Sequence, residues 1–231
     1  MAHHSQSVRA AGLTTGLAIG LLAMGYHLHW RKRLTNWGAT PAEVALPLAG
    51  DEVRADVDLV TTRAIAISAP PSCVWPWLVQ MGSGRAGTYS YDWAENLIGL
   101  DMHSAEVILP QFQQVSLGDE FPLAGRNSVM RVAAVEPERQ LAFCCGDGKW
   151  VSSYRLLPAA DTTRLVSRNR IVLPDGTPRA MLIRAFMEPC WLMFERKMLL
   201  GIKCRAERLA HDAGLAPTAE ARPSGWGGEH F

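Results

Sequence analysis

The sequence predicts an α+β domain in which antiparallel strands pack against one long C-terminal helix. Residues 59–68 alternate apolar and polar side chains, and so does the longest such run, "DTTRLVSRNRIVLP". Glycine-containing turns separate further strand-like runs between these two, and a long amphipathic segment follows them. Hydrophobic residues make up 48% and charged residues 19% of the 231 residues, so one domain can bury a substantial core.

Composition and charge argue against several classes of function. The formal net charge is +1, and nucleic-acid binding is disfavoured because basic residues of the last helix interleave with acids. There is no zinc-type Cys/His spacing and no phosphate-cradling glycine loop, so we expect no metal and no nucleotide cofactor. Five cysteines is an odd number, and Cys144 and Cys145 are adjacent. This is typical of reduced thiols in a cytosolic compartment and not of a disulfide framework.

The N-terminal segment predicts a membrane anchor. Residues 10–30 contain no Asp, Glu, Lys or Arg and would span about 31 Å as a helix, which matches a bilayer core. The triplet "RKR" follows, whereas only Arg9 precedes, so the positive-inside rule predicts a single-pass membrane protein whose main domain is cytoplasmic. A cleaved signal peptide and a buried helix of a soluble chain are the alternatives.

Three glycines of this segment raise the question of a partner. Gly12, Gly16 and Gly20 share one face of a helix, where the absence of side chains lets two backbones approach closely. They predict a helix–helix partner in the membrane. The alternative interpretation is that membrane helices are simply rich in glycine. The expected organisation is a tail at 1–9, a transmembrane helix at 10–30, a connector at 31–58, a ligand-binding domain at 59–213 and a disordered tail at 214–231.

Three short helices are expected before the main run of strands. In the connector, Thr40 is a good N-cap with Glu43 three residues later. Residues 72–81 carry several large apolar side chains at helical spacing, with Pro76 in the first turn. In "GTYSYDWAENLIGL", Ser90 is the expected N-cap of the third helix.

A helical wheel divides that third helix into two halves. Tyr91, Trp93, Ala94, Leu97, Ile98 and Leu100 cover one half, and Asp92, Glu95, Asn96 and Gly99 cover the other. We expect the apolar half to face the core. The carboxylates then face solvent, or else line the mouth of a cavity.

The last strand and the last helix complete the pattern. Arg164, Arg168 and Arg170 share one face of the strand, which we expect to be solvated. The opposite face mixes apolar residues with Ser167 and Asn169, a composition that suits a ligand cavity. The long helix is expected to begin at Pro189 and to end before Gly214, with "RAMLIRAFMEP" as a lead-in turn or a gate.

The order of elements resembles the helix-grip fold of the START-like (SRPBCC) superfamily, in which a curved antiparallel sheet wraps a long C-terminal helix. The segments "APPSCVWPWLVQMGSGRAGTYSYDWAENLIGLDMHSAEVILP", "MRVAAVEP" and "ERKMLLGIK" also resemble an actinobacterial-type, membrane-anchored subgroup. Proteins of this kind are commonly labelled polyketide cyclase/dehydrase or lipid-transport-like. The resemblance implies an interior cavity under the last helix and no agreed catalytic residue.

The residues expected to line that cavity share bulky apolar bodies or small polar tips. They are Trp75, Leu78, Tyr89, Tyr91, Trp93, Phe143, Trp150, Ser152, Tyr154, Ser167, Asn169, Phe194 and Met198. For each of them, packing in a core without a ligand is an equally good interpretation. Asp92, Glu95 and His103 are the candidates for general acid–base chemistry, and none of them forms a recognisable dyad by its spacing.

Three functions compete at this point. The first is a membrane-tethered protein that binds or carries a hydrophobic small molecule or lipid in an internal cavity. The second is a cavity enzyme of the cyclase or dehydratase type. The third is a scaffold that pairs with a membrane partner through the glycine face. The sequence favours the first, because desolvating an apolar ligand needs no catalytic group.

Overall fold

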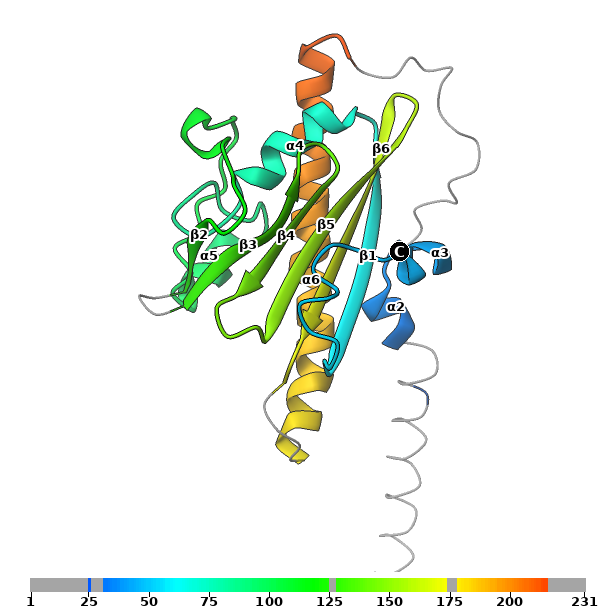
Figure 1. The fold of residues 1–231 in the computed structure, drawn as a ribbon, viewed down its shortest axis with the longest axis vertical. Coiled ribbons are helices and arrows are strands. Elements are labelled where there is room, and N and C mark those ends of the chain that lie inside the picture. The colour runs from blue at the N-terminus through cyan, green and yellow to red at the C-terminus, as the bar shows by residue number, and fades with distance from the viewer. Residues whose placement is uncertain (1–24, 26–30, 125–127, 174–177, 216–231) are drawn as a thin grey trace, which may run out of the picture.

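The computed structural model describes residue 25 and residues 31–124, 128–173 and 178–215 (Figure 1). Its elements follow one another in the predicted order of strand, short helices, antiparallel strands and long helix. They are α2 (Arg31–Thr35), α3 (Pro41–Ala45), β1 (Leu59–Ile67), α4 (Pro71–Val79), α5 (Asp92–Leu97), the 3-10 helix η2 (Pro110–Phe112), β2 (Glu120–Ala124), β3 (Ser128–Glu136), β4 (Gln140–Cys145), β5 (Trp150–Ala159), β6 (Thr162–Ile171) and α6 (Pro178–Asp212).

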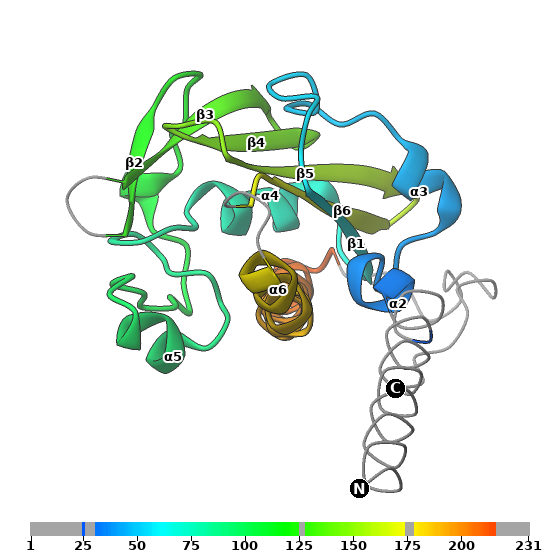
Figure 2. The same cartoon turned by 90° about the horizontal axis from the view of Figure 1, so that it is seen from below.

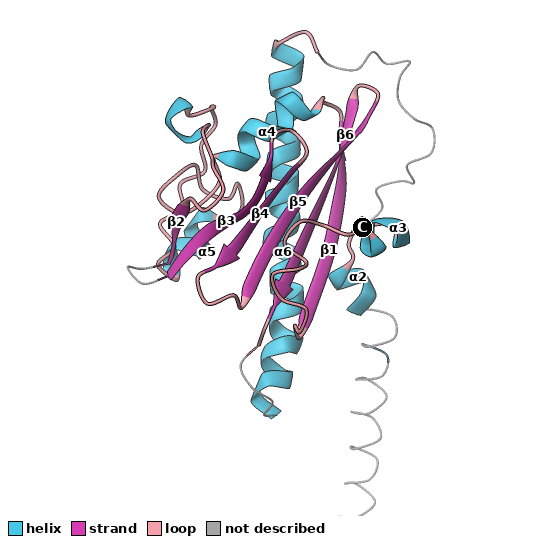
Figure 3. Cartoon of the chain, in the orientation of Figure 1, coloured by secondary structure: helices cyan, strands magenta, loops and turns pink. Residues whose placement is uncertain are grey.

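The six strands form one antiparallel sheet in the order β1-β6-β5-β4-β3-β2. Figure 3 shows α6 running behind the sheet along its length, and Figure 2 shows the sheet curving over α6. A curved antiparallel sheet, in which the first strand pairs with the last and a long C-terminal helix crosses one face, is the predicted helix-grip arrangement. The α+β, helix-grip part of the fold prediction is therefore confirmed.

The core lies between the inner face of the sheet and the C-terminal half of α6. Leu199, Ile202 and Ala206 of α6 are fully buried in the same apolar cluster as Leu165 of β6 and Leu78 of α4. Apolar side chains at three- and four-residue spacing place one face of the helix on the sheet. Burial of this kind is the main source of stability in such a layer.

The prediction that α6 begins at Pro189 is wrong. The helix starts at Pro178 and continues through Pro189 to Asp212. A proline inside a helix removes one N–H donor, but the rest of a long packed helix outweighs this loss. The predicted end is confirmed, because Gly214 takes a positive φ of 67° and Leu215 N donates to Ala210 O at 2.8 Å. Pro76 also lies inside its helix, beyond the first turn of α4.

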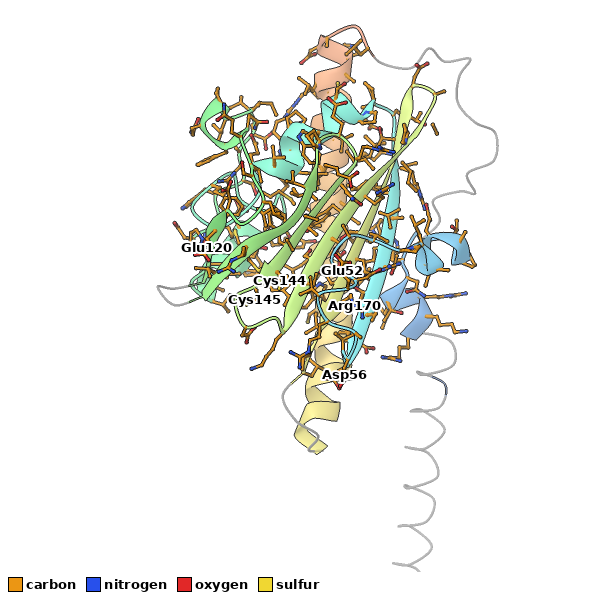
Figure 4. The ribbon with its side chains drawn as sticks, viewed as in Figure 1. Glu52, Asp56, Glu120, Cys144, Cys145 and Arg170 are labelled. Atoms are coloured by element: carbon orange, nitrogen blue, oxygen red, sulfur yellow. The ribbon has the colours of Figure 1, made fainter. Side chains whose placement is uncertain are left out.

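The prediction that the arginine face of β6 is solvated is wrong as well. Arg164 donates to both carboxylate oxygens of Glu43, and Arg168 donates to Asp51 and to the carbonyls of Glu43, Val44 and Leu46. Residues 38–51 therefore cover the outer face of the sheet, as Figure 2 shows for α3 and the chain after it. Figure 4 places Glu52 and Arg170 on this same side, opposite α6. Ion pairs with the covering segment satisfy the guanidinium groups of Arg164 and Arg168 that it buries.

The predicted capping box of that segment is confirmed. Glu43 N donates to Thr40 Oγ1 at 3.3 Å, and Thr40 N donates to Glu43 Oε2 at 2.7 Å. The cap fixes the direction of α3, and the same Glu43 side chain then reaches Arg164. One acidic residue therefore serves both a local cap and a tertiary contact.

The prediction for the faces of α5 is wrong for Glu95 and for three of the apolar residues. Glu95 is buried, whereas Trp93, Leu97 and Ile98 are 70%, 78% and 73% exposed. The expected cap is absent too, because Ser90 Oγ donates to Phe194 O and Tyr91 occupies the N-cap position. Hydrogen bonds from the loops on either side hold the polar half of α5 against the body, and they outweigh the apolar pattern of the helix.

The expected transmembrane helix at 10–30 and the tail at 1–9 lie outside the described residues, except for Gly25. None of the helices that the structure describes is long and apolar enough to cross a bilayer. All five cysteines are free thiols, in agreement with the expectation that the chain has no disulfide framework. Figure 4 shows Cys144 and Cys145 side by side on β4.

Candidate functional site

A cluster of polar side chains lies buried between the sheet and the middle of α6. It consists of Arg63 on β1, Ser152 and Tyr154 on β5, Ser167 and Asn169 on β6, and Glu195 on α6. We call these six residues the interior polar cluster. The strand register brings them together, because Ser152 pairs with Asn169 and Tyr154 pairs with Ser167. Partners in an antiparallel pair point to the same face of a sheet.

Glu195 joins α6 to the sheet at the centre of this cluster. Its carboxylate accepts a hydrogen bond from Ser167 Oγ at 2.7 Å and forms an ion pair with Arg63. Arg63 is fully buried, and its guanidinium also donates to the Leu34 carbonyl at 2.9 Å. A buried ion pair whose remaining donors are satisfied fixes geometry more than it adds stability. The pair therefore sets the position of α6 on the inner face.

Tyr154 supplies a neutral hydroxyl to the same space. Its hydroxyl accepts from Ser152 Oγ at 3.2 Å and donates to Met198 Sδ at 3.8 Å. Burial raises the pKa of the Tyr154 phenol well above its ordinary value, and the nearby Glu195 charge raises it further. Tyr154 is therefore a hydrogen-bonding group at neutral pH and not a source of phenolate.

The end of the sheet where β5 begins carries an aromatic cover over the cluster. Trp150 Nε1 donates to Asn169 Oδ1 at 2.9 Å, and the Trp150 ring meets Trp191 of α6 edge to face at 5.3 Å. The Phe143 ring meets two further rings edge to face, with its centre 6.1 Å from that of Phe121 and 6.4 Å from that of Tyr154. The aromatic rings give apolar walls, and the cluster gives a few polar tips, which is the composition of a small-molecule site.

The polar groups of the cluster pair with one another. Two pockets lined by described residues lie outside the space between the sheet and α6. One pocket, of ≈ 320 Å³, lies beside α4 and is lined by Trp75, Val79, Gln113, Gln114, Val115, Ser116, Val135 and Pro137. The other is a groove of ≈ 370 Å³ on the outer face of α6.

That outer groove runs between α2 and the start of α5. It is lined by Leu34, Tyr91, Pro189, Leu192, Met193, Arg196, Lys197 and Leu200. Its walls are apolar, and its charged groups are both cationic. Tyr91 meets Phe194 edge to face at 5.6 Å on one side of it. The groove is open to solvent and carries no buried hydrogen-bonding group of the kind that the interior polar cluster offers.

The predicted lining residues separate into three groups. Phe143, Trp150, Ser152, Tyr154, Ser167, Asn169 and Met198 come together at or beside the interior polar cluster. Leu78 and Tyr89 belong to the packed core, where Tyr89 donates to Trp77 O at 3.0 Å and accepts from Gln80. Trp75, Tyr91, Trp93 and Phe194 lie outside the interior: Trp75 borders the pocket beside α4, Tyr91 borders the outer groove next to Phe194, and Trp93 faces solvent.

The three candidate acid–base residues do not meet. Asp92 accepts from Ser104 N and Ser104 Oγ at 2.7 and 2.6 Å, and Glu95 accepts from Thr88 Oγ1 at 2.8 Å. Burial raises the pKa of Glu95, the Thr88 hydrogen bond opposes this, and the Asp92 charge adds to it. His103 is 76% exposed beside Asp101. These contacts hold loops in place, and none of the three faces the interior polar cluster.

Arg63, Glu195 and Trp191 belong to the site but were missed by reasoning from the sequence. Arg63 shares an alternating face with Thr61 and Ile65, and an arginine inside such an apolar run is the signal that marks an inward charge. Glu195 lies between two apolar positions of α6, Trp191 and Met198, at helical spacing. No group of His, Cys, Asp and Glu in the described part of the chain is suited to hold a metal ion.

Comparison with solved structures finds matches at low sequence identity and low TM-score. MLL2253 from Mesorhizobium loti is 16% identical with a TM-score of 0.39, over 65% of this chain and 98% of that one. CalU16 from Micromonospora echinospora is 18% identical with a TM-score of 0.36, over 67% and 83%. The Polyketide_cyc-like protein Cgl2372 from Corynebacterium glutamicum is 15% identical with a TM-score of 0.32, over 68% and 91%. No family model and no curated protein matches the chain. The fold assignment therefore rests on the strand order and on the position of α6.

Proposed function

We propose that this chain, which has the helix-grip architecture of the START-like superfamily, binds an apolar small molecule that carries one polar group. The ligand would lie under residues 188–198 of α6, between the aromatic cover and the interior polar cluster. The observation that carries this proposal is the cluster itself. Ser152, Ser167 and Asn169 face inward among apolar side chains, where a plain core avoids such groups.

The energetics favour an apolar ligand. Burying about 300 Å² of apolar ligand surface contributes roughly 7 kcal/mol at about 25 cal/mol per Å², before the costs of association. Binding requires the edge-to-face contact of Trp150 and Trp191 to open, because these two rings cover the cluster. The polar tip of the ligand would then replace the hydrogen bond between Trp150 and Asn169.

A titration with a fluorescent fatty acid tests this proposal. Asn169→Leu should weaken binding roughly three- to tenfold, the effect of one hydrogen bond of about 0.5–1.5 kcal/mol. Leu192→Ala, which alters only the outer groove, is the matched control and should leave the affinity unchanged. A loss of affinity in Leu192→Ala alone would move the ligand to the groove, and absence of saturable binding by the parent chain would refute the proposal.

The membrane tether remains part of the proposal. A helix at 10–30 would hold the domain next to a bilayer, where apolar ligands partition, and would make transport between membrane and cytoplasm possible. Resistance of the full chain to carbonate extraction supports the tether, and release by carbonate contradicts it.

A further inference from the structure

Three large apolar side chains of α5 and its C-cap residue point into solvent. Trp93, Leu97 and Ile98 lie on one side of the helix, and Met193 of α6 is half exposed. Isolated exposed apolar residues are common, but neighbours on one helix form a patch that marks an interaction surface. The proposed ligand site does not use this patch.

Hydrogen bonds from the body hold α5 in this orientation. Glu95 accepts from Thr88, Asp92 accepts from Ser104, and Asn96 both donates to Met102 O at 2.8 Å and accepts from Met102 N at 2.6 Å. Asp92, Glu95 and Asn96 are thereby hydrogen-bonded to the loops next to α5, and Glu95 is buried. The exposure of the apolar half is a consequence of these contacts and not of a loose helix.

Two exposed cations lie on α6 at the groove that Met193 lines. Along residues 189–200 of α6 the charged side chains are Glu195, which is buried, and Arg196 and Lys197, which are exposed at the outer groove. Lys197 Nζ lies 6.0 Å from the centre of the ring of Tyr91, the residue that precedes α5. Asp101 is the exposed acidic residue that follows α5 most closely in the sequence. Its carboxylate lies 3.2 Å from His103 Nε2.

The chain enters the domain on the same side. Figure 2 shows α5 on one flank of α6 and α2 on the other, with the sheet above all three. Lys32 and Arg33 of α2 are exposed, Leu34 borders the outer groove, and Arg31 pairs with Glu188 of α6 at 3.2 Å. The uncharged residues 10–30 immediately precede this helix in the sequence. Cations next to aromatic and aliphatic side chains are the groups that bind the interface of an anionic bilayer.

We propose that the chain docks on a negatively charged lipid bilayer through a docking face made of Trp93, Leu97, Ile98, Met193, Arg196 and Lys197. The apolar side chains enter the interface, and the two cations bind lipid phosphates. This surface would turn the outer side of α6 toward the membrane. It is independent of the ligand proposed for the interior.

Hydrogen exchange of the full chain tests the docking face. The chain is reconstituted with bilayers of phosphatidylcholine alone or of phosphatidylcholine and phosphatidylglycerol at 7:3. We expect the amides of residues 92–99 to exchange about tenfold more slowly with the anionic bilayer. The double variant Leu97→Ser/Ile98→Ser should lose this protection. Val53→Ser, which removes an exposed apolar side chain on the opposite side of the sheet, should keep it.

Three results would overturn the proposal. Fast exchange of residues 92–99, equal in both bilayers and in detergent, excludes a bilayer contact. Slow exchange of these residues, equal in both bilayers and in detergent, shows that another part of this chain or a second copy covers α5. Loss of protection in Val53→Ser as well shows that the effect is not specific to the docking face. Circular dichroism of each variant separates these results from a failure to fold.

Discussion

Arg63 and Glu195 form the contact through which the helix and the sheet hold each other. Both side chains are buried, and the carboxylate also accepts from Ser167. Arg63 reaches the Leu34 carbonyl as well, so that α2, β1 and α6 meet at one guanidinium group. Two charges removed from water must be paired, because an unpaired buried charge costs several kcal/mol.

Glu195→Gln tests the weight of this contact. The amide keeps the size of the side chain but leaves the Arg63 charge without a buried counter-charge. We expect the free energy of unfolding to fall by about 3–5 kcal/mol in urea denaturation. Glu120→Gln, at an exposed ion pair with Arg131, is the control and should cost about 0–1 kcal/mol. Equal losses in the two variants would show that the interior pair has no special role.

At the scale of elements, the segment at 38–51 behaves as an outer layer of the sheet. Its helix α3 begins with the capping box of Thr40 and Glu43, and the Glu43 carboxylate then binds Arg164 at 2.7 Å. Gly50 lies so close to β5 that an added Cβ would come within 2.9 Å of Val151 Cγ1. The segment is thus fitted to the outer face, and the arginines of β6 are buried beneath it.

The acid dependence of stability should report on this outer layer. Burial alone would raise the pKa of Glu43, but the hydrogen bonds and charge of Arg164 outweigh it and hold the pKa below the ordinary value of 4.5. The stabilisation is therefore complete above about pH 4.5 and is lost as the pH falls through the lowered pKa of the folded state. Glu43→Gln should cost about 3 kcal/mol at pH 7 and show a shallower loss of stability from pH 5 to pH 3.

Thermal unfolding measured across that pH range checks this prediction, with Glu120→Gln again as the exposed control. An unchanged slope in Glu43→Gln would mean that the carboxylate does not titrate differently in the folded and unfolded states. A rise in the stability of the parent chain on acidification would contradict the sign of the expected effect.

At the scale of the whole molecule, local patterns in the sequence predicted well where helices and strands occur, but predicted less well which of their faces are buried. Alternation and turn glycines marked β1 and the β4–β5 hairpin, because these signals depend on neighbours along the chain. The faces of α5 and β6 were predicted wrongly for a common reason. Glu95 is held by Thr88 of the preceding loop, and Arg164 is held by Glu43, which is distant in the sequence. A helical wheel or a strand pattern does not include such contacts.

The candidate site follows the same rule. Alternation along each strand was enough to predict that Ser152 and Tyr154 share one face of β5 and that Ser167 and Asn169 share one face of β6. The register of the two strands places these faces on the same side of the sheet. The role of Glu195 was not predictable, because its partners Arg63 and Ser167 come from two strands whose pairing the sequence does not specify. Pro189 was misplaced because a helix boundary signal is also compatible with the interior of a long packed helix.

Methionine methyl NMR gives the most direct test of the central claim, that the ligand lies inside and not on the outer groove. Met198 contacts Tyr154 within the interior, and Met193 borders the groove, so the two methyl groups report on the two places. The chain is labelled at its methionine methyl groups, and the two signals are assigned with Met198→Leu and Met193→Leu. On titration with a saturated fatty acid, the account predicts nuclear Overhauser contacts from the acyl chain to the Met198 methyl and none to Met193. Contacts to Met193 alone, or to neither methyl group, would contradict it.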